Sequence, residues 1–348
     1  MGVLTQPFWR ARRVLVTGHT GFKGGWLCSW LKSLGAEVTG YALPPATTPS
    51  LFEVAKVADG LRASILGDIR DLARLKDVFA QAQPEVVLHL AAQPLVRASY
   101  IDPVETYSTN VLGTVNVLEA ARGTPSVRAI VNVTSDKCYE NREWVWGYRE
   151  HEAMGGHDPY SSSKGCAELV AAAYRRSFNL PLASARAGNV IGGGDWSADR
   201  LVPDILKALA AGSPVEIRNP NATRPWQHVL EPLRGYLMLA ERVFQQPGEF
   251  ADGWNFGPRD EDCQPVAAVV SALVDAWGGQ ASWRAQPGAH PHEAGYLKLD
   301  SSKAHARLGW RPARSLAEGL ALTVEWHRAW LAGEDMNSLT IRQIAQHG

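Results

Sequence analysis

The sequence predicts an α/β protein with a doubly wound parallel sheet and a smaller C-terminal domain. Between residues 13 and 187, apolar segments of strand length alternate with amphipathic segments of helix length. A glycine-rich turn follows the first strand, and Val86–Ala92 is almost wholly apolar, as expected for a strand that is covered on both faces. Right-handed crossovers between such strands place a ligand site at their carboxyl ends.

The expected elements follow one another at short intervals. Arg13–Thr17 is expected to be the first strand, and the helix after the glycine turn carries Trp26, Leu27, Trp30, Leu31 and Leu34 on one side. Helices are also expected around the apolar stripe Leu72, Leu75, Val78 and Phe79, over residues 103–122, and from Tyr160 through Phe178. The further expected strands cover residues 37–43, 64–68, 86–92, 129–134 and 182–187.

The glycine turn reads Gly18-His-Thr-Gly21-Phe-Lys-Gly24. Its position between a strand and an amphipathic helix favours a dinucleotide site, because the glycines let the backbone approach a pyrophosphate and the helix N-terminus offers free N–H groups. The spacing G-x-x-G-x-x-G differs from the G-x-G-x-x-G of common dehydrogenases. A tight turn without a ligand is the alternative interpretation.

The domain boundary is expected near residue 187, where the alternation breaks into segments rich in Gly, Pro and Trp. Residues 1–187 then form an NAD-binding Rossmann domain, with a returning segment near 225–258. Residues 188–348 mainly form a substrate-binding domain that closes over the site. The tail after Glu334 is expected to be a loosely held surface segment.

Composition excludes several classes of function. The 348 residues carry 35 basic and 35 acidic side chains, which argues against nucleic acid or an anionic membrane as a partner. No apolar run has the length of a membrane span, and residues 1–12 lack the core of a signal peptide. The four scattered cysteines indicate reduced thiols in a cytoplasmic protein. His290, His292 and Glu293 lie in a loop-like run, and we expect no metal there.

Tyr160 and Lys164 lie one helical turn apart on the same face of the last expected helix. A nearby ammonium favours a phenolate and lowers the pKa of the phenol. Such a pair can take the proton of a substrate hydroxyl while a hydride leaves the same carbon. The spacing alone is a weak signal, so its interpretation depends on a hydride acceptor elsewhere in the chain.

Together with the motif T-G-x-x-G-F-x-G at 17–24, Asp68, Leu90–Ala92 and Asn110, the Tyr160–Lys164 pair resembles the extended short-chain dehydrogenase/reductase family. The resemblance implies NAD as the cofactor. The residues that it assigns to cofactor binding are Gly18, His19, Thr20, Gly21, Phe22, Lys23, Gly24, Asp68, Ile69, Leu90, Ala91, Ala92, Gln93, Tyr160 and Lys164.

Further segments are similar to the CDP-D-glucose 4,6-dehydratases, a lyase family; these segments are residues 134–139, 155–160, 186–196, 199–204 and 223–229. The resemblance implies dehydration of CDP-D-glucose to CDP-4-dehydro-6-deoxy-D-glucose by internal hydride transfer from C4 to bound NAD and back to C6. This reaction feeds 3,6-dideoxyhexose and lipopolysaccharide synthesis in the family. The catalytic residues that it implies are Ser135, Asp136, Lys137, Tyr160 and Lys164.

The sequence departs from its relatives at two places. The dTDP-glucose dehydratases carry an Asp-Glu pair, the acid and the base of the elimination, where this chain has Asp136-Lys137. Lys137 acts as a base only if its pKa is lowered; otherwise it holds a substrate oxygen or is a solvated side chain. The second departure is the missing acid in Val38–Leu43, where NAD enzymes usually grip the adenosine ribose. With His19 crowding or bonding the pyrophosphate, we expect weak NAD binding, and no nearby arginine favours NADP.

Substrate contacts are implied at four positions. Asn189 and Arg224 match the positions that contact the diphosphate in the family, while Arg200 and Tyr296 are assigned from position in the pattern alone. A guanidinium bonds phosphate oxygens in a fork. Trp146, Trp196 and Trp226 are expected either to stack on the base or to pack in the core.

Two other functions stay open. A nucleotide-sugar epimerase, or a dehydratase for another nucleotide, would share the Tyr–Lys pair and the cofactor fold. A non-catalytic sensor of NAD or a sugar nucleotide would have no use for Ser135, Tyr160 and Lys164 together. Family members pair through the helices at 103–122 and Tyr160–Phe178, so a homodimer or tetramer is expected.

Overall fold

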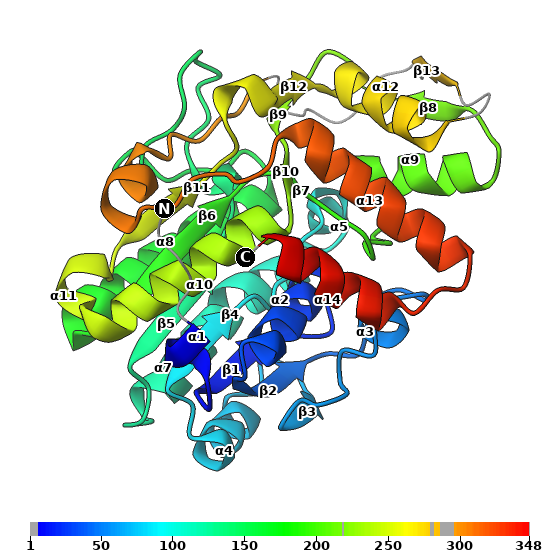
Figure 1. Ribbon diagram of the computed structural model, residues 1–348. Helices are drawn as coiled ribbons and strands as arrows, with labels where there is room; N and C mark the ends of the chain where they lie inside the picture. Colours follow the sequence, from blue (N-terminus) through cyan, green and yellow to red (C-terminus); the bar gives the residue numbers. More distant parts are fainter. Residues whose placement is uncertain (1–5, 218, 279–281, 286–295, 348) are drawn as a thin grey trace.

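The computed structural model describes residues 6–217, 219–278, 282–285 and 296–347. At its centre lies a seven-stranded parallel sheet with the order β11-β6-β5-β4-β1-β2-β3 (Figure 1). Its strands are β1 (Arg13–Thr17), β2 (Glu37–Ala42), β3 (Ala63–Leu66), β4 (Val86–His89), β5 (Ala129–Val133), β6 (Leu182–Ala187) and β11 (Gly253–Phe256). The predicted doubly wound parallel sheet is confirmed.

The direction in which strands are added reverses between β1 and β4, which are neighbours in the sheet. In their register, Thr17 lies opposite His89, so both strands end at the same level. A crevice opens at such a reversal, outside the carboxyl ends of the strands. The fold therefore defines one edge of the sheet at which a ligand site can form.

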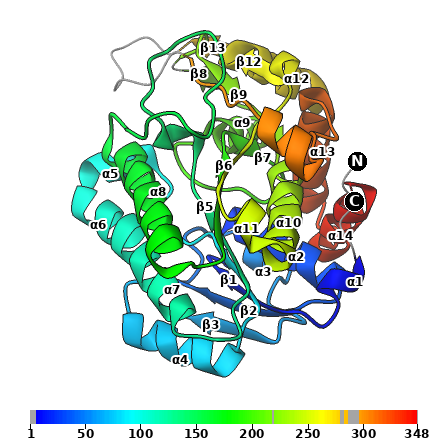
Figure 2. The same ribbon diagram turned by 90° about the vertical axis from the view of Figure 1, so that its left-hand side faces the viewer.

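Helices cover both faces of the sheet, which explains why β1, β4, β5 and β6 are buried along nearly their whole length. Figure 2 shows the two layers on opposite sides of the sheet. One layer contains α2 (Phe22–Ser33), α10 (Leu230–Gln245) and α14 (Met336–His347). The other contains α4 (Leu72–Ala82), α5 (Val96–Ile101), α6 (Pro103–Tyr107), the π-helical turn η1 (Ser108–Leu112), α7 (Gly113–Arg122) and α8 (Pro159–Phe178).

A smaller lobe lies beyond the carboxyl edge of the sheet (Figure 1). It has an apolar core of its own, to which α9 contributes Ile205, α12 contributes Leu273 and α13 contributes Leu320. Its elements are β7 (Val190–Ile191), α9 (Leu201–Ala210), β8 (Val215–Ile217), β9 (Thr223–Pro225), β10 (Gln227–His228), β12 (Cys263–Pro265), α12 (Val266–Trp277), β13 (Trp283–Ala285) and α13 (Leu316–Leu331). Residues 230–256 return to the main sheet as α10 and β11, and the domain boundary at residue 187 stays a prediction.

The remaining elements are short: α1 (Gln6–Trp9), α3 (Leu51–Val54), η2 (Asp136–Cys138), α11 (Pro247–Phe250), η3 (Asp260–Asp262) and η4 (Ala304–Leu308). In the part of the chain that the structure describes, no helix combines the length and the apolar character that crossing a bilayer requires.

Several strands end at earlier residues than the sequence predicted. The fourth strand ends at His89, not at Ala92, and the backbone N–H groups of Leu90 and Ala91 both donate to the hydroxyl of Thr17 at 3.2 Å. Residues 90–92 are thus a loop at the carboxyl edge. These residues line a cavity at that edge of the sheet and lie beyond the residues of β4 that pair with a neighbouring strand, so their apolar character does not indicate a strand.

The prediction of a loosely held tail after Glu334 is wrong. Residues 336–347 form α14, which buries Met336, Leu339 and Ile344 in the main core. Trp326 of α13 donates its indole N–H to Thr340 at 3.1 Å. The tail has only a narrow apolar stripe, and the surface that receives it comes from α2 and α13, so the sequence pattern within the tail was too weak to reveal its burial.

The C-terminal helix also brings His347 beside the buried His228 and Glu231. Arg314 donates to His347 Nδ1 at 3.3 Å, and Glu231 Oε1 lies 3.7 Å from the same nitrogen. Burial lowers the pKa of His347 to about 2 and that of His228 to about 3. Both imidazoles are therefore neutral in the folded protein over the physiological pH range.

We expect the folded state to lose stability as the pH falls below about 6.5, where these histidines become protonated in the unfolded chain but not in the folded one. Between its folded and its unfolded pKa, each such group contributes a slope of about 1.4 kcal/mol per pH unit, and its contribution to stability is present in full above the unfolded pKa. Urea unfolding of His347→Leu between pH 7.5 and 5 should show a shallower loss than the parent by about that slope. Identical slopes for the two proteins would contradict this account.

Candidate active site

A cavity of about 850 Å³ opens at the carboxyl edge of the sheet, between the sheet and the smaller lobe. Its volume suits ligands that are mostly enclosed. The glycine turn after β1, the ends of β2 to β5 and the start of α8 line one part. Residues 187–206 and β9 line the other part. All five predicted catalytic residues line this cavity.

The glycine turn brings the backbone of β1 and α2 against the β4 loop. Gly18 has φ +80°, and a Cβ there would lie 2.7 Å from the backbone nitrogen of Ala91. A Cβ on Gly24 would lie 2.0 Å from the carbonyl oxygen of Gly18. Side chains are excluded at both positions, and α2 begins at Phe22 with no side-chain cap. Free N–H groups at a helix N-terminus beside bare backbone fit the pyrophosphate of a dinucleotide.

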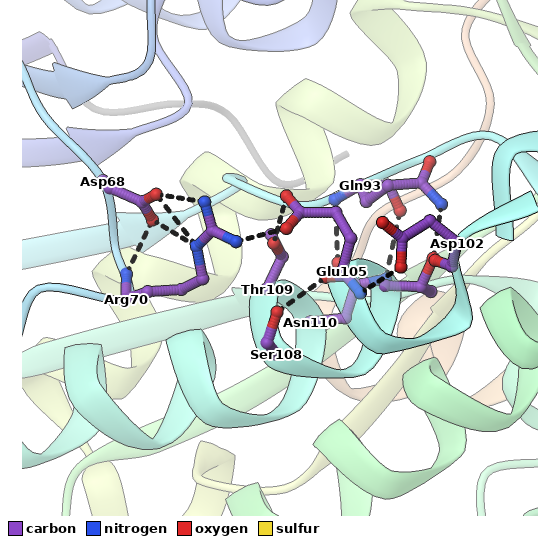
Figure 3. A network of polar contacts seen from close by, with 9 residues as sticks. Asp68, Arg70, Gln93, Asp102, Glu105, Ser108, Thr109 and Asn110 are labelled. Carbon is purple, nitrogen blue, oxygen red and sulfur yellow. Dashed lines mark hydrogen bonds and ion pairs between the residues drawn. The ribbon is translucent and has the colours of Figure 1, made fainter.

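Asp68 lies at one end of the cavity, held by Arg70 (Figure 3). The Nε of Arg70 donates to Asp68 Oδ2 at 2.9 Å, and Nη2 donates to the same oxygen at 2.5 Å. Hydrogen bonding to Arg70 lowers the pKa of Asp68. Arg70 also pairs with Glu105 of α6, so the carboxylate stays ionised and is tied to the helix beside it.

Asn110 joins three segments at the back of the site (Figure 3). Its Oδ1 accepts from the backbone N–H of Gln93 at 2.8 Å, and its Nδ2 donates to Ser163 of α8 at 2.9 Å. Asn110 lies on the π-helical turn η1, a distortion often found at functional sites. Gln93 itself turns away from the cavity, because its Nε2 donates to Thr106 at 2.9 Å. Asn110 therefore has a structural part in the site, while a cofactor contact by the Gln93 side chain stays a prediction.

His19 does not line the cavity. Its ring lies in the core against Gly40 of β2, where a Cβ would approach the ring to 2.3 Å, and its Nε2 lies 2.8 Å from Ser64 Oγ. Burial lowers the pKa of His19 to about 4. The ring therefore does not crowd the pyrophosphate position, and any cofactor contact at residue 19 falls to the backbone. Ala42, Leu43 and Pro44 line the cavity at the end of β2, so no acid faces it there, and weak NAD binding stays a prediction.

Ser135, Asp136 and Lys137 follow β5 directly. Ser135 caps the short η2 turn and donates its hydroxyl to Asp136 Oδ1 at 3.0 Å. Asp136 Oδ2 is buried and has no hydrogen-bond partner in the described part of the chain, and burial raises the pKa of Asp136. A Cβ on Gly188 would lie 2.8 Å from that oxygen, so this glycine leaves room for the carboxyl group. The arrangement favours a carboxylic acid that retains its proton.

Tyr160 and Lys164 extend from the first turns of α8, which begins with Asp158 as the N-cap and Pro159 at the first position. Burial raises the pKa of Tyr160 to about 12, while hydrogen bonding to Ser135 lowers it. Burial lowers the pKa of Lys164 to about 8, and its Nζ lies 3.5 Å from the carbonyl oxygen of Val133. Desolvation thus keeps the pKa of Tyr160 above its ordinary value, and the lowering of that pKa by Lys164 stays a prediction.

Sequence reasoning missed Tyr236 of α10. Lys23 of the glycine turn donates to Tyr236 Oη at 3.2 Å and lies over its ring at 5.4 Å. Burial lowers the pKa of Lys23 to about 7, and the positive charge of Arg200 lowers it further. Tyr236 comes from a helix far along the chain, and no local motif connects it to the site.

The predicted substrate residues divide into two groups. Asn189, Arg200 and Arg224 line the cavity, and Arg200 pairs with Asp195 at 3.2 Å. Tyr296 is not among the lining residues, and its hydroxyl donates to the carbonyl of Val145 at 3.2 Å. The structure brings the first three together in the cavity wall, while Tyr296 lies outside that wall, with its backbone bridged to Thr223 beside Arg224.

The three tryptophans also differ. Trp226 lines the cavity and donates to the carbonyl of Gln264 at 3.0 Å. Trp196 packs against Trp330 with ring centroids 5.0 Å apart, and Trp146 packs against Trp144 at 5.1 Å. His290, His292 and Glu293 lie outside the described residues. Within the described ones, no group of three or more His, Cys, Asp or Glu side chains is placed to hold a metal ion.

A parallel sheet with this strand order, a bare glycine turn and a buried Tyr-x-x-x-Lys pair at its carboxyl edge define an extended short-chain dehydrogenase/reductase. Residues 15–323 match the family described as GDP-mannose 4,6 dehydratase. The chain belongs to this family of NAD-dependent nucleotide-sugar dehydratases.

Individual relatives agree with this placement. The chain is 56% identical to a CDP-glucose 4,6-dehydratase of Salmonella typhimurium, over 99% of this chain and 98% of the relative. A structure of a dTDP-glucose 4,6-dehydratase from Streptomyces venezuelae with NAD and TYD bound superposes with a TM-score of 0.79 at 25% identity, over 93% of this chain and 99% of that one. A Thermus thermophilus UDP-glucose 4-epimerase in complex with NAD gives 0.79 at 26%, over 91% and 99%.

Proposed function

We propose that this protein is a lyase that converts CDP-D-glucose to CDP-4-dehydro-6-deoxy-D-glucose and water. The single observation that carries the proposal is the 56% identity to a CDP-glucose 4,6-dehydratase over nearly the full length of both chains. The cavity supports it, because an acid, a phenol and two lysines face one space large enough for a cofactor and a nucleotide sugar. NAD held there by the glycine turn and Asp68 would supply an acceptor for the hydride of C4 and a donor of that hydride to C6.

Tyr160 is proposed to take the proton of the sugar 4-hydroxyl. Only the phenolate can accept this proton, and the pKa of about 12 makes it a minor form at neutral pH, from which the reaction proceeds. Ser135 hydrogen-bonds to Tyr160 and stabilises that phenolate, since this bond lowers the pKa of Tyr160. The buried ammonium of Lys164 favours the phenolate in this step, because an opposite charge close by stabilises it.

Asp136 is proposed to protonate the departing 6-hydroxyl. Burial raises the pKa of this carboxyl group, and its Oδ2 has no partner among the described residues. A protonated acid can donate to a leaving oxygen, whereas an ionised one cannot. The 4-keto group acidifies C5–H, so the elimination also needs a base.

Lys137 is the candidate for that base. Its side chain lines the cavity next to Asp136, in the place where the dTDP-glucose dehydratases carry a glutamate. If it stays protonated, it instead holds the oxygen on which negative charge develops. The two roles predict different effects on the exchange of the C5 proton.

Arg224, Arg200 and Asn189 are proposed to bind the diphosphate of the nucleotide sugar. Arg224 is buried in the cavity wall, where a guanidinium meets phosphate oxygens with little competition from water. Trp226 lies in the same wall and is the tryptophan best placed to contact the base.

Epimerization is the second candidate, since a UDP-glucose 4-epimerase of Mycolicibacterium smegmatis is 30% identical over 91% of this chain. An epimerase has no hydroxyl to expel and no need for the buried acid at Asp136. That carboxyl group therefore favours dehydration.

We further propose a homodimer or tetramer in the cytoplasm, formed through the helical segment at 103–122 and α8. Exposed apolar side chains lie on α5, η1 and α8, where Ile101 is 86% exposed, Leu112 59% and Leu169 62%. The free state of all four cysteines in the structure is consistent with a reducing compartment. Other apolar side chains of the two pairing helices, Ala167, Ala171 and Leu118, lie in the core.

Purified protein with NAD and CDP-glucose should release one water per sugar, seen as a loss of 18 mass units, while dTDP-glucose reacts more slowly. Deuterium placed at C4 should reappear in the C6 methyl group. Tyr160→Phe should slow turnover about 10²- to 10⁴-fold because proton transfer is lost. Conversion of CDP-glucose without a change of mass would identify an epimerase instead.

The roles of Asp136 and Lys137 separate in deuterated water. Asp136→Asn should slow the loss of water about 10²-fold or more. Deuterium from the solvent should still enter C5 of the recovered sugar, because the base is intact. If Lys137 is the base, Lys137→Ala should lose both the exchange and the elimination. Turnover close to the parent in Lys137→Ala would show that the side chain is merely solvated.

Leu169→Glu should convert the dimer to monomers, because a charge at the centre of an apolar interface is left without a partner. Sedimentation equilibrium gives the mass directly. Leu331→Glu, at the end of α13 and 50% exposed, is the matched control and should leave the mass unchanged. A wild-type monomer, or a Leu169→Glu dimer, would contradict this interface.

A further inference from the structure

A buried ion pair lies directly behind the catalytic residues. Glu168 of α8, one turn beyond Lys164, is 3% exposed and pairs with Arg186 of β6 at 2.8 Å. Its other oxygen accepts a hydrogen bond from Thr134, the residue before Ser135. One carboxylate thus joins the Tyr160–Lys164 helix to the end of β5 and to β6.

The pair continues into a buried chain of hydrogen bonds. Arg186 Nη1 donates to Tyr139 Oη at 2.7 Å, and Tyr139 Oη donates to Asn255 Oδ1 of β11 at 2.7 Å. The same guanidinium donates to the carbonyl of Glu150 at 2.9 Å. The segment on each side of η2 is therefore attached to the sheet through Arg186.

Several ionisable groups face Lys164 from the elements around it, and most carry no negative charge at neutral pH. On α8, Tyr160 is protonated, and on η2 burial raises the pKa of Cys138 so that the thiol stays neutral. On β4, burial lowers the pKa of His89 to about 3, and on α2, Lys23 bears a positive charge when protonated. Arg186 keeps the Glu168 carboxylate ionised, and the negative charge of this carboxylate raises the pKa of Lys164.

We propose that Glu168 is a positioning residue of the dehydratase, which sets the register of α8 against the Ser135–Asp136 segment and keeps Lys164 cationic during the reaction. A purely structural buried pair could be exchanged for apolar side chains with little effect on stability. Here the carboxylate touches the elements that carry the reacting groups, and its charge is opposite to that of Lys164. The proposal rests on the proposed function only in using dehydration as its readout.

The effect of the charge on Lys164 has a definite sign. The pKa of Lys164, about 8 with Glu168 present, falls when the carboxylate is neutralised. Lys164 then loses its proton at lower pH. The alkaline limb of the pH–rate profile, which is the fall in turnover at high pH, therefore moves to lower pH. For charges roughly 6 Å apart at an effective dielectric constant near 20, the shift is about one to two pH units.

Glu168→Gln tests this directly, because the amide has the shape of the carboxylate: its oxygen can accept from Arg186 while its NH2 group donates to the Thr134 hydroxyl. Turnover at saturating NAD and sugar nucleotide is recorded from pH 6 to 9. The alkaline limb should lie about one to two pH units below the parent, with about a tenfold or larger loss at pH 8.

Tyr139→Phe is the matched control, since it removes two hydrogen bonds from the same chain and changes no charge. It should lower stability and leave the alkaline limb in its parent position. Glu168→Asp keeps the charge on a shorter side chain, so it should reduce turnover through lost register without moving the limb. Because it keeps the charge, this variant also decides the question if Glu168→Gln does not fold.

The proposal is overturned if the alkaline limb of Glu168→Gln lies at the same pH as in the parent. It is also overturned if the limb of Tyr139→Phe shifts as far as that of Glu168→Gln, or if the limb of Glu168→Asp shifts. The profiles are measured with whichever nucleotide sugar the parent dehydrates. An error about the cytidine base would therefore appear in the parent assay, while an error about Glu168 would appear only in the variants.

Discussion

Burial of ionisable side chains at the carboxyl edge of the sheet is the constraint on which the chemistry of this protein depends. Desolvation disfavours every charged form, so it raises the pKa of Tyr160 and Asp136 and lowers that of Lys164 and Lys23. The raised pKa of the carboxyl group and the lowered pKa values of the two lysines arise from the same cause. Specific partners then adjust each group, as Ser135 does for Tyr160 and Glu168 for Lys164.

The architecture produces that burial by bringing distant segments over one edge. The glycine turn after β1 and the loop after β4 form one wall, and residues 187–206 and β9 form the other. Behind them, α10 contributes Tyr236 and β11 contributes Asn255, both from segments that return to the main sheet after the smaller lobe has begun. The cavity is consequently a product of the crossover connections and of the lobe together, and neither part encloses it alone.

Local patterns were enough for the elements that carry their own signal. The strands β1 and β6 and the end of α8 lie where periodicity placed them, and the catalytic residues meet in one cavity as the resemblance implied. Errors arose where the deciding partner is distant in sequence. The burial of α14 depends on a surface made by α2 and α13, and His19 turns into the core because Gly40 of β2 leaves space for its ring.

The sequence by itself determined the sheet, the glycine turn, the spacing of Tyr160 and Lys164 and the family, because each of these is encoded within a short window or a series of motifs in order. Only the tertiary structure decided the directions in which burial shifts pKa values in the site, the absence of Tyr296 and the His19 ring from the cavity wall, and the ion pair of Glu168 with Arg186. The physical reason is that a pKa and a contact depend on desolvation and on neighbours from other elements, which no local window contains.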